Sequence, residues 1–247
     1  MKPKHSYKRG HPVALLVGFE QDHAVLWQVF SQVIKPYVTL RLAGTRKNGR
    51  SLYDLHESVI KALKSVLEEG VTSIVVTAPM KTTYAADFMS HVRKHHAYLI
   101  QSKGSNRATF AELVGSADLP HSVAELVKTK EFSESIAETT SGEADYIITA
   151  LEKSLSQTDS NRLVLFSLKE IEDKIYDREK RDDIGAAYLV LTDEYLAESK
   201  NKNRIQRLLQ ISANKKVKTR VIVADTPAGK RIKQFGGLIF FTMTTKP

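Results

Sequence analysis

Residues 12–42 read PVALLVGFEQDHAVLWQVFSQVIKPYVTLRL, and their pattern predicts the first strands of the chain. It holds two apolar runs of strand length, residues 13–19 and 23–30, which are separated by a polar turn. After Pro36, apolar and polar residues alternate up to Leu42, which is typical of a half-buried strand. Successive strands with short connections predict an antiparallel meander.

The segments after this meander predict helices packed on an extended sheet. Residues 54–67 place their apolar side chains on one helical face. The run VTSIVVTAP (71–79) is typical of a strand buried in a parallel sheet. A second helix is predicted over residues 83–95. Two short apolar segments follow, for which we expect a strand at residues 97–100 and a short helix at residues 110–114.

The composition of the chain changes near residues 130–145, where a polar segment with Ser, Thr and Gly predicts an inter-domain connection. Beyond it, helical and strand patterns alternate up to GLIFFTM (237–243), which predicts a compact α/β sandwich. We therefore expect an α/β protein with two domains, a mixed sheet with helices followed by this sandwich. The expected parts are a basic arm over residues 1–11, a first domain over residues 12–133 and a second domain over residues 134–247.

The composition excludes several classes of protein. With 247 residues, 42% of them hydrophobic and 26% charged, the chain can bury a core and is neither wholly disordered nor collagen-like. The lack of cysteine excludes disulfides, thiolate metal sites and a cysteine nucleophile. No apolar run approaches the roughly 18 residues that span a bilayer, and no signal peptide opens the sequence. We therefore expect a soluble cytoplasmic monomer that does not associate with membranes.

Positive charge is concentrated toward the two ends of the chain, whose net charge is +9. Residues 1–130 carry 18 Lys and Arg against 10 Asp and Glu, residues 134–183 carry 7 against 13, and residues 200–247 carry 12 against one. Basic surfaces of this kind suit a phosphate backbone, because each neutralised phosphate releases a counterion. Solvated lysine-rich helix faces are the alternative interpretation, and charge alone leaves both open.

The loop GTRKNGR (44–50) is the main candidate for contact with nucleic acid. Its glycines let the backbone approach phosphates closely, while the side chains of Arg46, Lys47 and Arg50 clamp them. An ordinary connection from a hairpin to a helix, with surface charge, is the alternative interpretation. The supporting basic surface that we expect comprises Lys8, Arg9, Arg93, Lys94, Lys103 and Arg107.

Motifs for other chemistry are incomplete. His91 and His95 are four residues apart and Asp87 precedes them by four, which is a spacing that metal ligands use on one helical face. The HExxH motif is missing because Val92 stands where its Glu belongs, and we interpret this segment as a solvated basic helix end. Neither a GxSxG elbow nor a complete phosphate-binding loop occurs. We therefore expect no catalytic residue, no metal and no cofactor.

Four segments together carry a resemblance to a known family: HAVLW (23–27) with the basic loop, VVTAP (75–79), AAYLVLTDEYL (186–196) and AGKRIKQFGGLIFFTM (228–243). They resemble Pelota, the stalled-ribosome rescue factor of archaea and eukaryotes that is related to their class-I release factors. The resemblance covers about residues 12–245. It implies an RNase-H-like middle domain and an L7Ae/L30e-like C-terminal domain, in which Gly236 and Gly237 are structural glycines.

Two departures from the family pattern bear on function. Pelota and the release factors begin with a further N-terminal domain that enters the decoding centre, whereas about eleven basic residues precede the middle-like domain here. We therefore expect that this chain does not probe the codon or the empty A site in the family's usual way.

The second departure concerns the catalytic glutamine. The release factors carry Gly-Gly-Gln on a loop in this region, and a related group of peptidyl-tRNA hydrolases carries Gly-x-x-Gln. At the matching place this chain has Gly49-Arg50-Ser51-Leu52, and no glutamine occurs between Gln32 and Gln101. Because that glutamine positions the water that attacks the peptidyl ester, the resemblance implies a factor without ester hydrolysis.

The resemblance also implies partners. The family binds a translational GTPase of the elongation-factor-1α class and, at another stage, the ribosome-recycling ATPase. We expect a non-enzymatic, ribosome-associated translation factor in rescue, recycling or dormancy, whose basic loop contacts rRNA or tRNA. An RNA-binding module, an enzyme that cleaves RNA or peptidyl-tRNA, and a scaffold for the GTPase remain as alternatives. A two-metal nuclease needs clustered carboxylates, and the first three strands offer only Glu20.

Overall fold

The computed structural model describes residues 10–101, 107–156, 163–177 and 186–243. The described residues form two compact units, of which one falls within residues 1–65 and 72–140 and the other within residues 66–71 and 141–247. After the short excursion at residues 66–71, the last passage from the first unit into the second lies within helix α5 (Lys130–Ser156). The segment that we expected as a polar connection is therefore helical.

Helix α5 is continuous because its polar and apolar residues both suit a helix. The hydroxyl of Thr139 donates to the carbonyl of Ser135 at 2.9 Å, so this side chain is satisfied within the helix itself. Phe132 is buried in the core of the first unit, while Ile147 and Leu151 are buried in the core of the second. Because α5 contributes buried apolar residues to the core of each unit, the connection between the units is helical and not a loop.

The first unit contains a mixed sheet in the strand order β3-β2-β1-β4-β5. Strand β1 pairs antiparallel with β2, which pairs antiparallel with β3, and this confirms the predicted meander. Strand β4 pairs parallel with both β1 and β5. The strands of this sheet are β1 (Pro12–Phe19), β2 (His23–Phe30), β3 (Ile34–Arg41), β4 (Ser73–Ala78) and β5 (Thr109–Val114).

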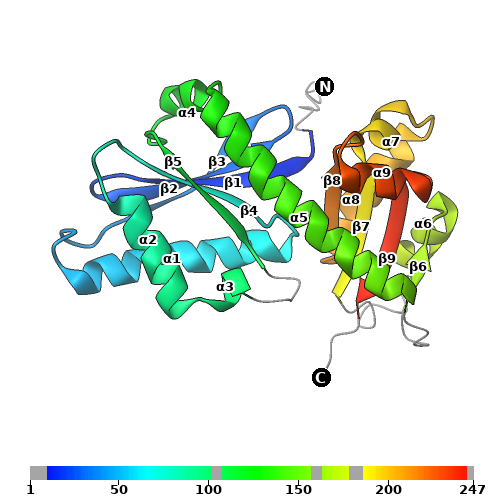
Figure 1. The fold of residues 1–247 in the computed structure, drawn as a ribbon, viewed down its shortest axis with the longest axis horizontal. Helices are drawn as coiled ribbons and strands as arrows, with labels where there is room; N and C mark the ends of the chain where they lie inside the picture. The colour runs from blue at the N-terminus through cyan, green and yellow to red at the C-terminus, as the bar shows by residue number, and fades with distance from the viewer. Residues whose placement is uncertain (1–9, 102–106, 157–162, 178–185, 244–247) are drawn as a thin grey trace, which may run out of the picture. The chain divides into compact units, whose positions relative to one another are not determined.

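Helices cover both faces of this sheet (Figure 1). On one face, Leu16 of β1 lies in a cluster with residues of α4 and α5. On the other face, the ring of Phe19 lies 4.9 Å from that of Phe88 in α2 and 5.8 Å from that of His56 in α1. Because β1 is buried on both faces, its sequence is a continuous apolar run. The helices are α1 (Gly49–Glu68), α2 (Tyr84–His95), α3 (Tyr98–Gln101) and α4 (Pro120–Leu126).

Two short segments differ from the sequence predictions. Residues 97–100, predicted as a strand, belong largely to α3, whose turn is closed by the amide of Gln101 donating to the carbonyl of Ala97 at 2.8 Å. Residues 110–114, predicted as a short helix, belong to β5. Their apolar spacing fits a helix, but parallel pairing with β4, in which Phe110 lies opposite Ile74, decides the outcome.

The second unit has a sheet in the order β6-β9-β7-β8, with helices on both faces. One face packs against α5 and α9 and the other against α6 and α8, so alternate residues of β7 and β9 enter two separate cores. This confirms the predicted α/β sandwich. Its elements are β6 (Val164–Leu165), α6 (Leu168–Tyr176), β7 (Ala186–Thr192), α7 (Asp193–Glu198), α8 (Lys202–Asn214), β8 (Lys218–Ile222), α9 (Pro227–Gln234) and β9 (Leu238–Met243).

None of the helices within the described ranges combines the length and the apolar character that crossing a bilayer requires.

Candidate functional site

The basic loop lies at the edge of the first sheet where the parallel strands end. The loop between β3 and α1 is tied to the turn between β1 and β2, because the amide of Leu42 donates to the carbonyl of Asp22 at 2.7 Å. Strands β1 and β4 run parallel, so the carboxyl end of β4 reaches the same edge. In open α/β sheets, this carboxyl edge is the common place for ligand binding.

Asn48 shapes the loop where helix α1 begins. Its side-chain oxygen accepts hydrogen bonds from the amides of Arg50 at 3.0 Å and Ser51 at 3.3 Å, which satisfies two amides of the first turn. Gly44 has φ +118°, a left-handed conformation that side chains disfavour. These features define the backbone of the loop at Gly44 and at its junction with helix α1.

Arg46 holds this loop in place. Its Nε donates to the carbonyls of Glu20 at 3.1 Å and Gln21 at 2.9 Å, and its Nη2 also donates to Glu20. Its guanidinium carbon lies 3.7 Å from the ring centroid of Tyr84, the first residue of α2. Partial burial lowers the pKa of Arg46 below its usual value. This side chain joins three segments of the fold and is only partly available to a ligand.

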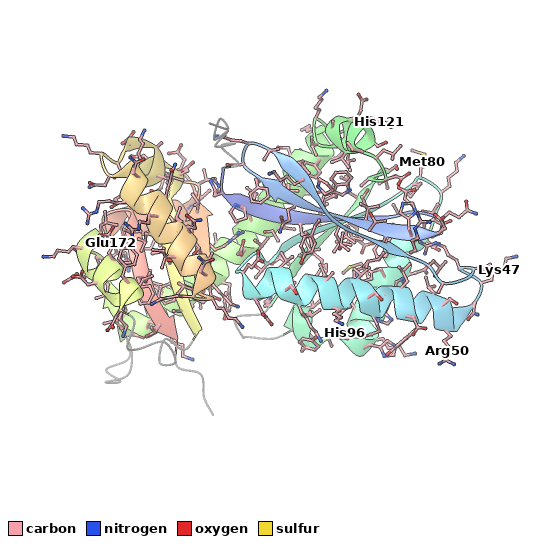
Figure 2. All side chains as sticks on the ribbon, turned by 180° about the vertical axis from the view of Figure 1, so that it is seen from behind. Lys47, Arg50, Met80, His96, His121 and Glu172 are labelled. Carbon is pink, nitrogen blue, oxygen red and sulfur yellow. The ribbon has the colours of Figure 1, made fainter. Side chains whose placement is uncertain are left out.

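Lys47 and Arg50, in contrast, are exposed and extend outward at the start of α1 (Figure 2). Both lie beside the N-terminus of a 20-residue helix, where the helix dipole creates positive potential. Of the three loop cations, these two can reach phosphate groups freely.

The supporting basic residues that the structure describes lie away from the basic loop. Arg93 and Lys94 lie in the last turn of α2, whereas Arg46 stacks on Tyr84, the first residue of that helix. Because a 12-residue helix is about 18 Å long, these two cations lie far from the basic loop. Arg93 also pairs with Glu112 at 3.5 Å. Arg107 is exposed and precedes β5, at the opposite end from the basic loop. The remaining predicted cations, Lys8, Arg9 and Lys103, lie outside the described residues.

The same carboxyl edge carries acidic and hydroxyl side chains that sequence reasoning did not assemble. The hydroxyl of Ser116 donates to Glu20 at 2.7 Å. His23 contacts Asp22 at 2.7 Å and Asp118 at 2.8 Å through its two ring nitrogens. Partial burial disfavours the charged ring, but the bonds to the two aspartates outweigh this effect and raise the pKa of His23. All three carboxylates thus have hydrogen-bond partners within the edge.

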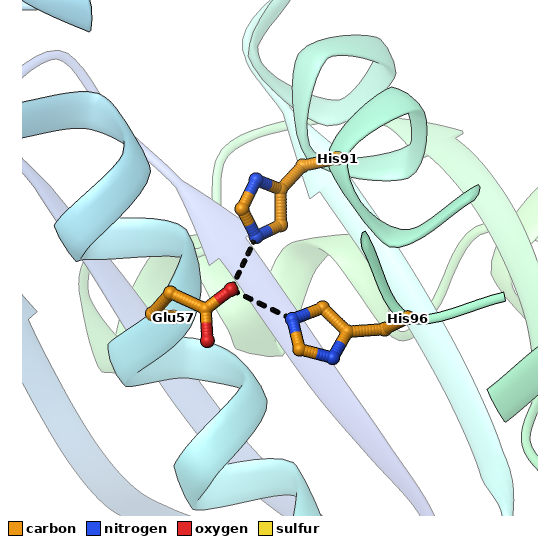
Figure 3. Close-up of side chains that lie close together, drawn as sticks. All are labelled: Glu57, His91 and His96. Carbon is orange, nitrogen blue, oxygen red and sulfur yellow. Dashed lines mark hydrogen bonds and ion pairs between the residues drawn. The ribbon is translucent and has the colours of Figure 1, made fainter. Parts of the chain in front are cut away.

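A second cluster lies between α1 and α2 (Figure 3). The Nε2 atoms of His91 and His96 both contact the same oxygen of Glu57, at 2.9 Å and 2.7 Å. Within the described ranges, Glu57, His91 and His96 form the group whose ligand atoms could hold a metal ion. The helical set considered from the sequence does not form, because Asp87 instead accepts from the hydroxyl of Thr83 at 2.8 Å.

The environment of this cluster is aromatic and partly dry. The hydrogen bond from His96, together with that from His91, lowers the pKa of Glu57 below its usual value. Burial lowers the pKa of His91, and it lowers that of the neighbouring His56 to about 4. His56 lies 5.0 Å from His91 between ring centroids, and its buried Nε2 has no hydrogen-bond partner among the described residues.

One feature of the sequence could have indicated this cluster. The adjacent pair His56-Glu57 falls within the helix predicted over residues 54–67, and a histidine-rich run ends the next predicted helix. Contact between these segments requires both helices to cover the same face of the sheet. The strand order, which the sequence alone does not specify, creates that arrangement.

Gly236 and Gly237 end helix α9 in left-handed conformations, with φ +92° and +84°. A side chain at Gly236 would meet open space, so only its backbone would be strained. A Cβ at Gly237 would also lie 3.1 Å from the side chain of Tyr195. The carbonyl of Gly237 accepts from the amide of Thr192 at 3.0 Å, which joins the helix end to β7.

Comparison with known proteins finds similarity at the level of structure. No protein-family model matches the chain, and no curated protein matches it significantly. A structure of ribosome-bound archaeal Pelota and ABCE1 is similar over 99% of this chain and 65% of that chain, with 14% sequence identity and a TM-score of 0.53. The structure of Dom34 of S. cerevisiae, described as interacting with Hbs1, is similar over 95% of this chain and 64% of the Dom34 chain, with 16% sequence identity and a TM-score of 0.48.

An archaeal translation termination factor, aRF1, is also among the structural neighbours, with 12% identity, a TM-score of 0.31 and coverage of 94% of this chain and 62% of that chain. The similarity to archaeal Pelota agrees with the sequence resemblance. The likeness to archaeal Pelota shows the fold. The chain spans less than two thirds of the length of these first neighbours.

Proposed function

We propose that this chain is a translation factor that binds the ribosome and acts in rescue, recycling or dormancy without breaking a bond itself. The observation that carries the proposal is the fold, which is similar to that of ribosome-bound archaeal Pelota over 99% of the chain. Within it, we assign residues 12–133 to a middle-like domain and residues 134–247 to a C-terminal-like domain, in a cytoplasmic protein.

The exposed loop cations supply the contact with RNA in this proposal. Arg46 fixes the loop through the backbone of the β1–β2 turn, and Lys47 and Arg50 bind phosphates of rRNA or of a tRNA acceptor arm. Two exposed cations at a helix N-terminus suit a phosphate backbone, which a protein contacts without reading its sequence. The loop holds no glutamine, so we assign it a binding role and not ester hydrolysis.

Partner proteins complete the proposal. The neighbouring structures include a Pelota with ABCE1 and a Dom34 that interacts with Hbs1. We propose that this chain likewise engages a translational GTPase and a ribosome-recycling ATPase. The acidic stretch over residues 134–183 provides charge for a basic partner surface, and the basic stretch over residues 200–247 provides charge for rRNA.

The experiment that tests this function compares ribosomes with free RNA. Labelled protein is incubated with purified ribosomes in the presence of increasing protein-free rRNA, and bound protein is separated by pelleting. A ribosome factor remains bound when free rRNA is present in excess, because the ribosome presents the RNA in one specific shape. Equal competition by free rRNA would favour an RNA-binding module. In a parallel incubation with peptidyl-tRNA and rRNA, release of the peptide or cleavage of the RNA would favour the enzyme.

A further inference from the structure

We propose that Glu57, His91 and His96 form a binding site for a divalent transition-metal ion of the zinc class, between helices α1 and α2 (Figure 3). The site is independent of the basic loop and of the proposed ribosome function. It rests on the convergence of three ligand atoms, on the way the backbone brings them together, and on the packing that holds their rings.

The three ligand atoms converge on one point. Two imidazole nitrogens and a carboxylate oxygen all lie within 4.8 Å of one another, and both nitrogens point at the same oxygen of Glu57. With metal–ligand bonds of about 2.0–2.1 Å, neighbouring ligands around a tetrahedral ion are roughly 3.3 Å apart. The present separations of 2.7 Å and 2.9 Å are hydrogen-bond lengths. Opening each by about half an ångström, through small side-chain rotations, makes room for an ion.

The end of helix α2 brings His96 into the site. In a continuous helix, a residue five positions after His91 would point to a different face, because each residue turns the chain by about 100°. Helix α2 ends at His95, and His96 adopts φ −131° and ψ +37°, outside the helical region. Its ring consequently returns to the same carboxylate oxygen as that of His91. The histidine at helical spacing, His95, is exposed.

Neighbouring rings restrain both histidines, and solvent reaches the third ligand. Tyr53 lies 5.0 Å from His91 between ring centroids, and Tyr98 lies 5.8 Å from His96, both with edge-on geometry. The side chains of His91 and His96 are 7% and 12% exposed, whereas that of Glu57 is 36% exposed. An ion can therefore enter beside Glu57, and its fourth position faces solvent.

The donor set selects the class of ion. Imidazole nitrogens suit zinc and neighbouring transition metals, whereas Mg²⁺ and Ca²⁺ prefer ligand sets made of oxygen. A bound ion joins the middle of α1 to the C-terminal end of α2. Because an unfolded chain presents no preformed site, metal binding stabilises the folded first unit.

The test measures Zn²⁺ binding to the full chain, first stripped of metal, by competition with a chromophoric chelator, with Mg²⁺ as a second probe. Two substitutions remove one ligand each while keeping a hydrogen-bonding group in its place: Glu57→Gln and His96→Gln. Two controls remove histidines that the proposal does not use, namely the exposed His95→Gln at the end of α2 and His121→Gln on α4 (Figure 2). Circular dichroism of the metal-free proteins verifies folding.

We expect the wild type and both control variants to bind one Zn²⁺ per chain and to melt at a higher temperature when it is present. We expect the affinity to fall roughly 100-fold or more in Glu57→Gln and His96→Gln, since even loss of an outer-shell partner costs 10–100-fold. No saturable binding, equal preference for Mg²⁺, unchanged affinity in His96→Gln, or an equal loss in His95→Gln would each overturn the assignment. Ribosomes are absent from this assay, so its failure leaves the proposed function untouched.

Discussion

In the basic loop, Arg46 stabilises the backbone, whereas Lys47 and Arg50 are exposed and are proposed to bind RNA. Substitutions can measure these two roles separately. We predict that Arg46→Ala destabilises the fold, whereas Lys47→Ala/Arg50→Ala leaves the fold intact and weakens binding to RNA. Arg46 donates to two backbone carbonyls and stacks on Tyr84, while Lys47 and Arg50 are exposed.

The expected magnitudes follow from these contacts. Hydrogen bonds from a charged donor contribute roughly 1.5–3 kcal/mol, and a partly exposed cation–π contact contributes about 0.5–1 kcal/mol. Because Arg46 is only partly buried, we expect its loss to lower the free energy of unfolding by about 2 kcal/mol. The double variant should change this free energy by less than about 0.5 kcal/mol.

Two assays separate the roles. Urea denaturation gives the free energy of unfolding, and ribosome binding at increasing salt gives the slope of log affinity against log salt concentration. Each phosphate contact contributes roughly 0.7–0.9 to that slope, so the double variant should reduce it by about 1.5. Lys61→Ala/Lys64→Ala is the matched control, because it removes two exposed positive charges from the C-terminal half of the same helix, away from the loop.

Either of two results would refute this reasoning. If Arg46→Ala unfolds at the same urea concentration as the wild type, its backbone contacts do not stabilise the loop. If Lys47→Ala/Arg50→Ala and the control change the salt slope equally, the loop contributes general charge and no specific phosphate contact.

Three further predictions concern stability. Gly237→Ala should cost about 2 kcal/mol and Gly236→Ala about 1 kcal/mol in urea denaturation, since only the former adds a close contact to the left-handed strain; equal costs would contradict this explanation. His23→Gln should lower the free energy of unfolding more near pH 5.5 than near pH 8.5. The pKa of His23 is raised in the folded protein, so protonation of its ring stabilises the fold. This contribution is complete below the unfolded-state pKa of about 6.5 and is lost as the pH rises through the folded-state pKa. The opposite trend in paired denaturation curves would exclude the bonds to its aspartates as the cause. Glu143→Gln should cost about 3 kcal/mol by the same assay, because it removes the buried carboxylate that pairs with the 5% exposed Arg220; a loss under about 1 kcal/mol would show that the other contacts of Arg220 compensate.

The sequence predicted the parts of the fold that depend on strong local patterns. The long apolar runs of β1 and β2 and the alternation in β3 led to the meander, which the pairing confirms. Prediction failed at residues 97–100 and 110–114, where four apolar residues in each segment fit either a helix or a strand. In the second case, the free edge of β4 decided in favour of a strand, and no local pattern encodes that edge.

The candidate sites were predictable only in part, for the same reason. Charge and glycine content located the basic loop, but the anchoring of Arg46 depends on carbonyls more than twenty positions away in the chain. For the histidines, helical spacing pointed to His95, whereas the structure brings His96 to Glu57. That choice depends on the residue at which α2 ends, and helix ends are among the features that sequence patterns locate least well.

The most direct test of the central proposal is co-sedimentation of the full chain with ribosomes, with separated subunits and with free rRNA. It is carried out over a series of salt concentrations, with and without a translational GTPase and a non-hydrolysable GTP analogue. The proposal predicts saturable binding to ribosomes, weaker binding to either subunit alone, and an affinity that rises when the GTPase and the analogue are present. Binding that does not saturate, or that is equal for ribosomes and free RNA and unaffected by the GTPase, would contradict it.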